Sequence, residues 1–106
     1  MVRSIRVLYR GVKGRVRKNF NWPPIHRNSA VVVTACEYSP DDTPRFTEGG
    51  RPNLGDATIF VTNVGPHDPE GGDGGVEFYL HVDWPDPLNV AVTISVLEDI
   101  ETFHQA

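Results

Sequence analysis

Apolar and polar residues alternate along much of this chain, and this alternation predicts β-strands. The clearest case is VEFYLHVDW, residues 76–84, where every second residue is apolar. Because successive side chains of a strand point to opposite faces, one set is predicted to face the core and the other to face outward. The predicted core set is Val76, Phe78, Leu80, Val82 and Trp84. The predicted outward set is Glu77, Tyr79, His81 and Asp83.

Five further segments are predicted to be strands because they are rich in β-branched and aromatic residues. They are VRSIRVLYR (2–10), VKGRVRK (12–18), SAVVVTACEY (29–38), DATIFVTNV (56–64) and LNVAVTISVLE (88–98). The first two are predicted to pair as a hairpin. The third is almost continuously apolar, which predicts burial on both faces. Residues 39–55 hold three prolines and three glycines and are predicted to be a long connection.

These elements predict an all-β fold. No window shows the apolar spacing of a helix, and turn-forming residues recur about every ten positions, as in antiparallel sandwiches. We therefore expect residues 1–106 to form a single-domain antiparallel β-sandwich of about six strands, with a small β-barrel as the alternative. The tail, residues 99–106, is predicted either to form a last helical turn or to fray. Cys36, the sole cysteine, excludes an internal disulfide and is predicted to be a buried hydrophobic residue.

Charge is divided unevenly along the chain, whose net charge is −4. Residues 1–36 hold eight of the ten basic side chains and no acid, whereas all fourteen carboxylates follow. This division predicts ion pairs within the fold or between subunits, or a basic binding surface. No apolar segment is long enough to span a bilayer, and the N-terminus lacks the continuous apolar core of a signal peptide. We expect no membrane association and a cytoplasmic location.

The outward face of residues 76–84 is the first candidate site. Side chains two residues apart on a strand lie about 7 Å from one another, so His81 and Asp83 can converge on one ligand. With Tyr79 and the adjacent Trp84, they form the predicted ligand-binding set, for a small molecule or a carbohydrate. The alternative is an ordinary solvated sheet face.

The acidic, glycine-rich loop before this strand is a candidate metal site. Carboxylates on a flexible backbone suit calcium, although the spacing matches no established calcium loop. The predicted metal ligands are His67, Asp68, Glu70, Asp73, His81 and Asp83. A zinc or iron site would use only the two histidines and Asp83. The alternative is a plain surface loop, without any cofactor, whose glycines adopt positive φ.

The sequence carries no motif for catalysis. No serine lies in the context of a nucleophile elbow, and RGVKGR matches no phosphate-binding loop. Basic residues near Phe20 and Trp22 suit a nucleic-acid strand, but the net negative charge argues against that partner. We therefore predict a non-enzymatic binding or assembly module that self-associates into a homo-oligomer through complementary charges. Calcium binding and carbohydrate binding are the alternatives.

Overall fold

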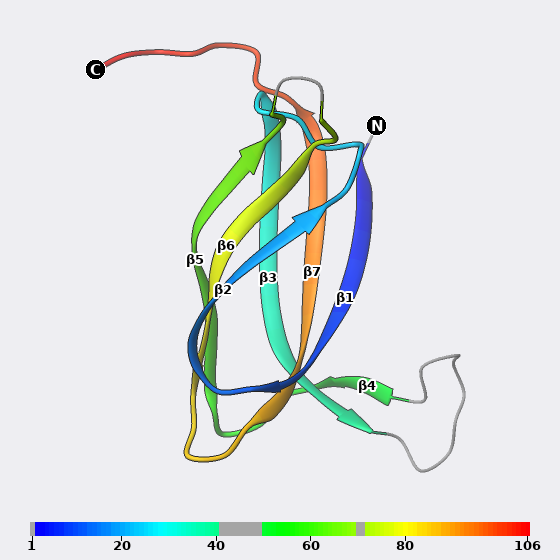
Figure 1. The fold of residues 1–106 in the computed structure, drawn as a ribbon, viewed down its shortest axis with the longest axis vertical. Helices are drawn as coiled ribbons and strands as arrows, with labels where there is room; N and C mark the ends of the chain where they lie inside the picture. The colour runs from blue at the N-terminus through cyan, green and yellow to red at the C-terminus, as the bar shows by residue number, and fades with distance from the viewer. Residues whose placement is uncertain (1, 41–49, 70–71) are drawn as a thin grey trace.

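Two antiparallel sheets pack face to face in the computed structural model, which describes residues 2–40, 50–69 and 72–106 (Figure 1). The strands are β1 (Arg3–Val12), β2 (Gly14–Asn21), β3 (Ser29–Pro40), β4 (Gly50–Asn53), β5 (Thr58–His67), β6 (Gly75–Asp83) and β7 (Leu88–Asp99). One sheet has the order β1-β7-β3-β4 and the other β2-β6-β5. The predicted β-sandwich is confirmed. The barrel alternative is wrong, because the strands pair into two separate sheets.

The core lies between the sheets and follows the predicted alternation. The alternate residues of β6 and β7 are almost fully buried: Val76, Phe78, Leu80, Val82, Val90, Val92, Ile94 and Val96. The prediction for Trp84 is wrong, since its exposed fraction is 39%. Strand β6 ends at Asp83, so the alternation no longer determines the direction of the next side chain.

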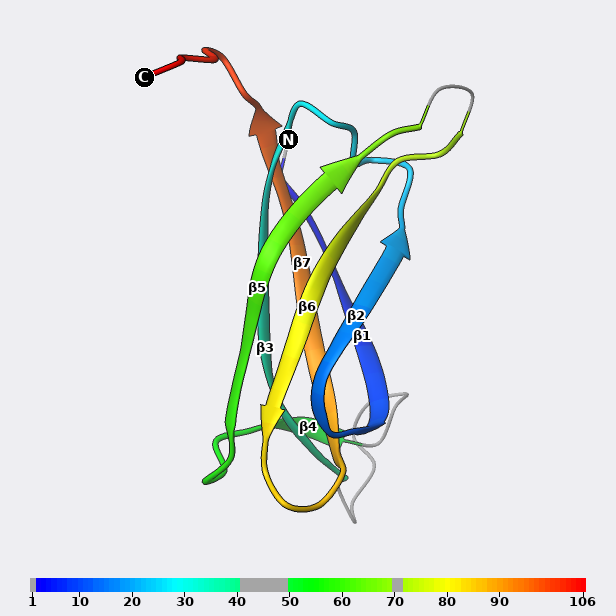
Figure 2. The ribbon, with the colours of Figure 1, turned by 60° about the vertical axis from the view of Figure 1, so that its left-hand side comes forward.

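The predicted hairpin over residues 2–18 is wrong. Strand β1 pairs with β7, and β2 pairs with β6 in the opposite sheet (Figure 2). Gly11 and Gly14 both have positive φ, at 65° and 70°, and they turn the chain across the end of the sandwich. Val12 lies between them and is buried in the core. Alternation specifies which face of a strand is buried, but it does not specify the neighbouring strand.

Strand β3 is central in its sheet but is not buried on both faces as predicted. Val32 remains 47% exposed, and Thr34 is exposed as well. Cys36, predicted to be buried, is half-buried. The predicted connection 39–55 contains the short strand β4, which pairs with the end of β3. The alternation was too short there to be recognised, since β4 consists of GRPN.

The C-terminal tail extends away from the sandwich, at the end opposite to β4 (Figures 1 and 2). It forms no helical turn in residues 100–106, so of the two predictions only an irregular tail holds. A single backbone hydrogen bond, from Ile100 N to Asn28 O at 2.8 Å, fixes its start. Within the described residues, no helix has the length and apolar character needed to cross a membrane.

Candidate functional site

The outer face of the β2-β6-β5 sheet carries the predicted ligand-binding residues. Strand β6 turns its other side chains into the core, so Glu77, Tyr79, His81 and Asp83 face outward as predicted. The pairing register places Arg15 of β2 and Phe60 of β5 on either side of His81. Three strands thus contribute side chains to one open surface.

The imidazole of His81 is contacted on one face of its ring and at its edge. Its ring stacks on Phe60, with centroids 4.3 Å apart and an angle of 6° between planes. Its Nε2 shares a 2.8 Å hydrogen bond with Oγ1 of Thr62. Phe60 is nevertheless 44% exposed, which is unusual for so large an apolar side chain. These contacts fix His81 in one orientation on the sheet surface.

Two arginines of β2 lean diagonally across β6. The guanidinium of Arg15 lies over the Tyr79 ring, 4.1 Å from its centroid. Nη2 of Arg17 donates to both carboxylate oxygens of Glu77, at 3.1 and 3.2 Å. Such exposed contacts contribute little to stability, on the order of 1 kcal/mol or less each. They do leave Tyr79 with one ring face covered.

Sequence reasoning found only part of this surface. It identified Tyr79, His81 and Asp83, which one strand brings to one face, and Trp84, which follows in the turn. It missed Phe60. In TIFVTNV this residue lies between Ile59 and Val61, so alternation alone would have placed its side chain on the face opposite to theirs. The pairing of β5 with β6 was the missing information.

The five predicted metal ligands that the structure describes are not gathered in one place. His67 pairs with Gly75, six residues along β6 from His81, which is about 20 Å in an extended strand. Nε2 of His67 instead contacts Oδ1 of Asn19 at 2.6 Å. Glu70 lies outside the described residues. Among the residues that are described, no group of three His, Cys, Asp or Glu side chains is placed to hold a metal ion.

The loop glycines serve close packing of the backbone. Positive φ occurs, among the described glycines, only at Gly11 and Gly14, so the predicted conformational role of the loop glycines is wrong at positions 72, 74 and 75. A Cβ atom on Gly74 would lie 1.4 Å from the carbonyl oxygen of Ile25. The carbonyl of Gly74 accepts a 2.8 Å hydrogen bond from Trp22 N. The loop glycines thus let the segment after β2 pack against the start of β6.

Some basic side chains of the first third of the chain pair with acidic side chains of the remainder inside the fold. Arg17 pairs with Glu77, and Arg27 Nε donates to Asp68 Oδ1 at 2.5 Å. His26 Nε2 lies 2.9 Å from Asp99 Oδ1. Each pair joins the basic first third of the chain to the acidic remainder. The predicted ion pairing therefore occurs within the chain for Arg17 and Arg27.

The Arg27–Asp68 pair gives a pH-dependent prediction. The hydrogen bond from the Arg27 side chain lowers the pKa of Asp68 below its ordinary value. Because the folded-state pKa is depressed, the contribution of the pair is present above the unfolded pKa of about 3.9 and is lost as pH falls through the folded value. An Arg27→Ala variant should raise the pKa of Asp68 in an NMR titration, whereas Arg17→Ala should not. An unchanged Asp68 pKa in Arg27→Ala would contradict this assignment.

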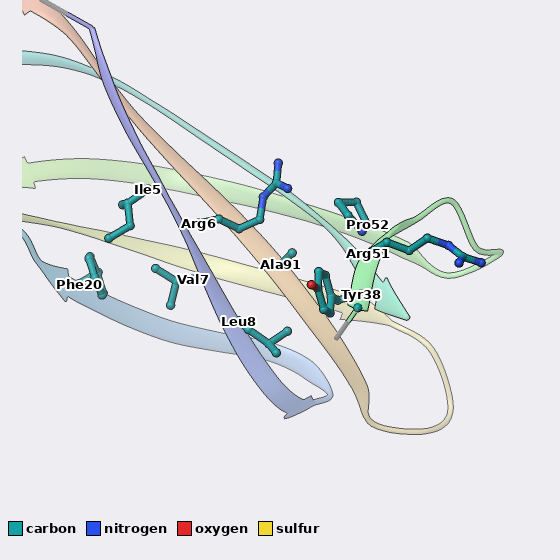
Figure 3. Close-up of a pocket in the computed structure, with 10 residues that line it drawn as sticks. Ile5, Arg6, Val7, Leu8, Phe20, Tyr38, Arg51, Pro52 and Ala91 are labelled. Carbon is teal, nitrogen blue, oxygen red and sulfur yellow. The ribbon is translucent and has the colours of Figure 1, made fainter. Parts of the chain in front are cut away.

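A groove of about 750 Å³ runs along β1, at the free edge of the four-stranded sheet (Figure 3). Figure 3 shows β1 crossing the middle of the groove, because alternate β1 side chains line its two sides. On the inter-sheet side lie Ile5, Val7 and Phe20, and on the outer side lie Leu8, Ala91 and Tyr38. We refer to this feature as the β1 groove. Most of its lining surface is apolar.

The outer wall of the β1 groove depends on Gly50. A Cβ atom there would lie 2.3 Å from Cε2 of Tyr38, so only glycine lets the Tyr38 ring lie against β4. Pro52 pairs with Tyr38 and also lines the groove. The cations Arg6 and Arg51 lie at its rim (Figure 3). The groove thus combines an apolar lining with positive charge.

A second, shallower depression of about 630 Å³ lies at the far end of the outer face of the β2-β6-β5 sheet. It contains His67 and Asp68 of the predicted metal set together with Arg27. Since the Asp68 carboxylate is engaged by Arg27, its charge is already compensated. This depression is therefore a weaker cation site than the sequence predicted, because the negative charge of Asp68 is already neutralised by Arg27.

Comparison of the chain with protein-family models, with curated proteins and with solved structures gave no match.

Proposed function

We propose that this β-sandwich is a non-enzymatic binding module that pairs the free edge of β1 with an extended, acidic peptide segment. The observation that carries the proposal is the β1 groove, an apolar groove with a cationic rim along an edge strand. Extended peptides are commonly bound by addition to a sheet edge, where main-chain hydrogen bonds supply affinity and flanking side-chain contacts supply specificity.

The strand edge supplies the main-chain part of this recognition. Among the described residues β1 pairs only with β7, so every second residue directs its N–H and C=O away from the sheet. The ten residues of β1 are long enough for several such bonds. An added strand would extend the four-stranded sheet by one.

The β1 groove supplies the surface that the side chains of a bound peptide would contact. Alternate side chains of an added strand point to opposite faces. One set would therefore contact Ile5, Val7 and Phe20, and the other would contact Leu8. Both sets meet apolar surface, which favours a ligand with apolar residues at intervals along its length.

Positive charge along β1 supports an acidic ligand. Arg6 Nε donates to the neutral Oγ1 of Thr93 at 3.0 Å, and Arg3 lies over the Trp22 ring. Arg10 is exposed on the same strand. Within the described part of the chain, none of these three arginines forms an ion pair with a carboxylate. An acidic peptide would supply the missing counter-charges and would also be steered toward the edge.

A labelled synthetic peptide of alternating Glu and Val residues tests the proposal. We expect NMR shifts at the backbone amides of residues 3–12 and binding that weakens with added salt. The variant Arg6→Glu should weaken binding at least about tenfold, since it reverses one charge at the rim. Arg15→Glu, which makes the same change on the outer face of the other sheet, is the matched control and should bind normally.

Three results would contradict the proposal. They are the absence of binding, equal binding of a Lys–Val peptide, and shifts confined to the outer face of the β2-β6-β5 sheet. The last result would favour the carbohydrate or small-molecule alternative, which is supported by the exposed Phe60. We rank that alternative second because Phe60 and His81 stack on one another, which leaves each with only one ring face for a ligand. No observation in the described residues favours calcium.

A further inference from the structure

The tail that follows β7 combines exposed apolar side chains with negative charge. Ile100 is 51% exposed and Phe103 is 83% exposed, although both are large hydrophobic residues. Glu101 accompanies them, and Glu98 and Asp99 are the last two residues of β7, directly before the tail. The tail therefore has the composition that the β1 groove is proposed to bind.

We infer that the occupant of the β1 groove is the C-terminal segment of a second copy of this chain, residues 100–106. This inference rests on the proposed function and identifies its ligand. The contact is heterologous, because the tail of one copy meets the β1 edge of the next. It would give the self-association through complementary charges that the sequence predicts.

The tail does not reach the outer side of the groove of its own copy. Leu8 lies opposite Ala91, eight residues before the end of β7, or about 26 Å along the strand. Phe103 follows the end of β7 by four residues, a reach of only about 13 Å when extended. Even Ile5, opposite Ile94, lies about 17 Å from that end. Leu8 and Ala91 are therefore beyond the reach of Phe103 of the same copy, whose side chain can approach only the near end of the groove at Ile5.

Charge favours the tail of a second copy, rather than its β1 strand, as the partner of the β1 edge. Two β1 strands from different copies would bring Arg3, Arg6 and Arg10 against like charges, which opposes edge-to-edge pairing. In the tail, Asp99 is engaged by His26, whereas Glu101 lies beyond the last backbone bond and is exposed. Glu101, Ile100 and Phe103 would therefore make the contact, with one charge and two apolar side chains.

Sedimentation velocity of the full chain over a range of concentrations tests the inference. We expect a mass above that of the monomer in low salt, which decreases at about 0.5 M salt because ion pairs are screened. Phe103→Asp should raise the dissociation constant at least about tenfold by placing an acid where an apolar side chain docks. Phe60→Asp is the matched control: it changes an exposed phenylalanine elsewhere and should leave association intact.

Complementation distinguishes a tail–groove contact from any other interface. Leu8→Asp damages the groove and leaves the tail, whereas Phe103→Asp damages the tail and leaves the groove. Each variant alone should be monomeric, and an equimolar mixture should form a heterodimer and nothing larger, because only one intact contact remains. Association that persists in both variants, or a mixture that stays monomeric, would overturn the inference.

The two proposals fail in different ways. If the wild-type chain is monomeric at every concentration but the Glu–Val peptide shifts residues 3–12, peptide binding stands and the second-copy inference falls. If the chain is monomeric and the peptide does not bind, both fall. If the chain associates but Phe103→Asp has no effect, the second-copy inference falls, and the peptide titration alone decides the proposed function.

Discussion

Replacement of Phe78 by alanine is expected to lower the free energy of unfolding by about 3–5 kcal/mol. Phe78 is 2% exposed and lies in the middle of β6, the central strand of its sheet. The truncation would open a cavity that the surrounding valines and leucines cannot fill. For a domain of this size the melting temperature should fall by about 15 °C or more. Calorimetry or chemical denaturation provides the measurement.

The control for Phe78→Ala is Phe60→Ala. Both residues lie in the β2-β6-β5 sheet, but Phe60 faces outward and is 44% exposed. Its truncation should cost about 1 kcal/mol or less, through the lost stacking on His81. Equal destabilisation by the two variants would mean that the faces of this sheet are assigned incorrectly. The candidate surface around His81 would then have to be abandoned.

Gly74→Ala is expected to destabilise the fold by at least about 3 kcal/mol. The added Cβ would lie 1.4 Å from the carbonyl oxygen of Ile25, a backbone atom that side-chain rotation cannot move away. Ile25 is itself buried at 1% exposure. Relief of the clash requires the two segments to separate, which breaks the hydrogen bond from Trp22 N to Gly74 O. Urea denaturation gives the change in unfolding free energy.

The matched control is Gly65→Ala. A Cβ on Gly65 meets nothing within 4 Å, and Gly65 is not among the glycines with positive φ. This variant should change the free energy of unfolding by about 1 kcal/mol or less, in either direction. If Gly74→Ala changed the free energy of unfolding as little as Gly65→Ala, the loop glycines would not be required for close packing. The prediction that the loop binds an ion would then have to be tested again.

The sequence was most informative where alternation was long. In β6, four apolar residues at every second position were enough to assign the buried face correctly. The same signal says nothing about pairing, since Ile5 of β1 and Val16 of β2 face the core equally well from one sheet or from two. The predicted hairpin was wrong for this reason. Gly11 and Gly14 mark a turn in either arrangement.

The candidate sites depend on the information that alternation lacks. His81 and Asp83 were placed correctly because they belong to one strand. Phe60 joins them only through the register of β5 against β6, and the β1 groove exists only because β1 is an edge strand. Tyr38 of β3 lines the groove beside β4, a four-residue strand within a segment that sequence composition assigned to a loop.

The central position of β7 has a consequence for synthesis of the chain on the ribosome. Ser4 of β1 lies against Ser95 of β7, 91 residues later. The strand that joins β1 to β3 is thus synthesised after the other six described strands, and Ile5, Val7 and Tyr9 stay uncovered until it emerges. Folding of the larger sheet therefore has to wait for β7 and is expected to be slow for the size of the domain. A nascent chain stalled before Leu88 should remain sensitive to protease and bind chaperones.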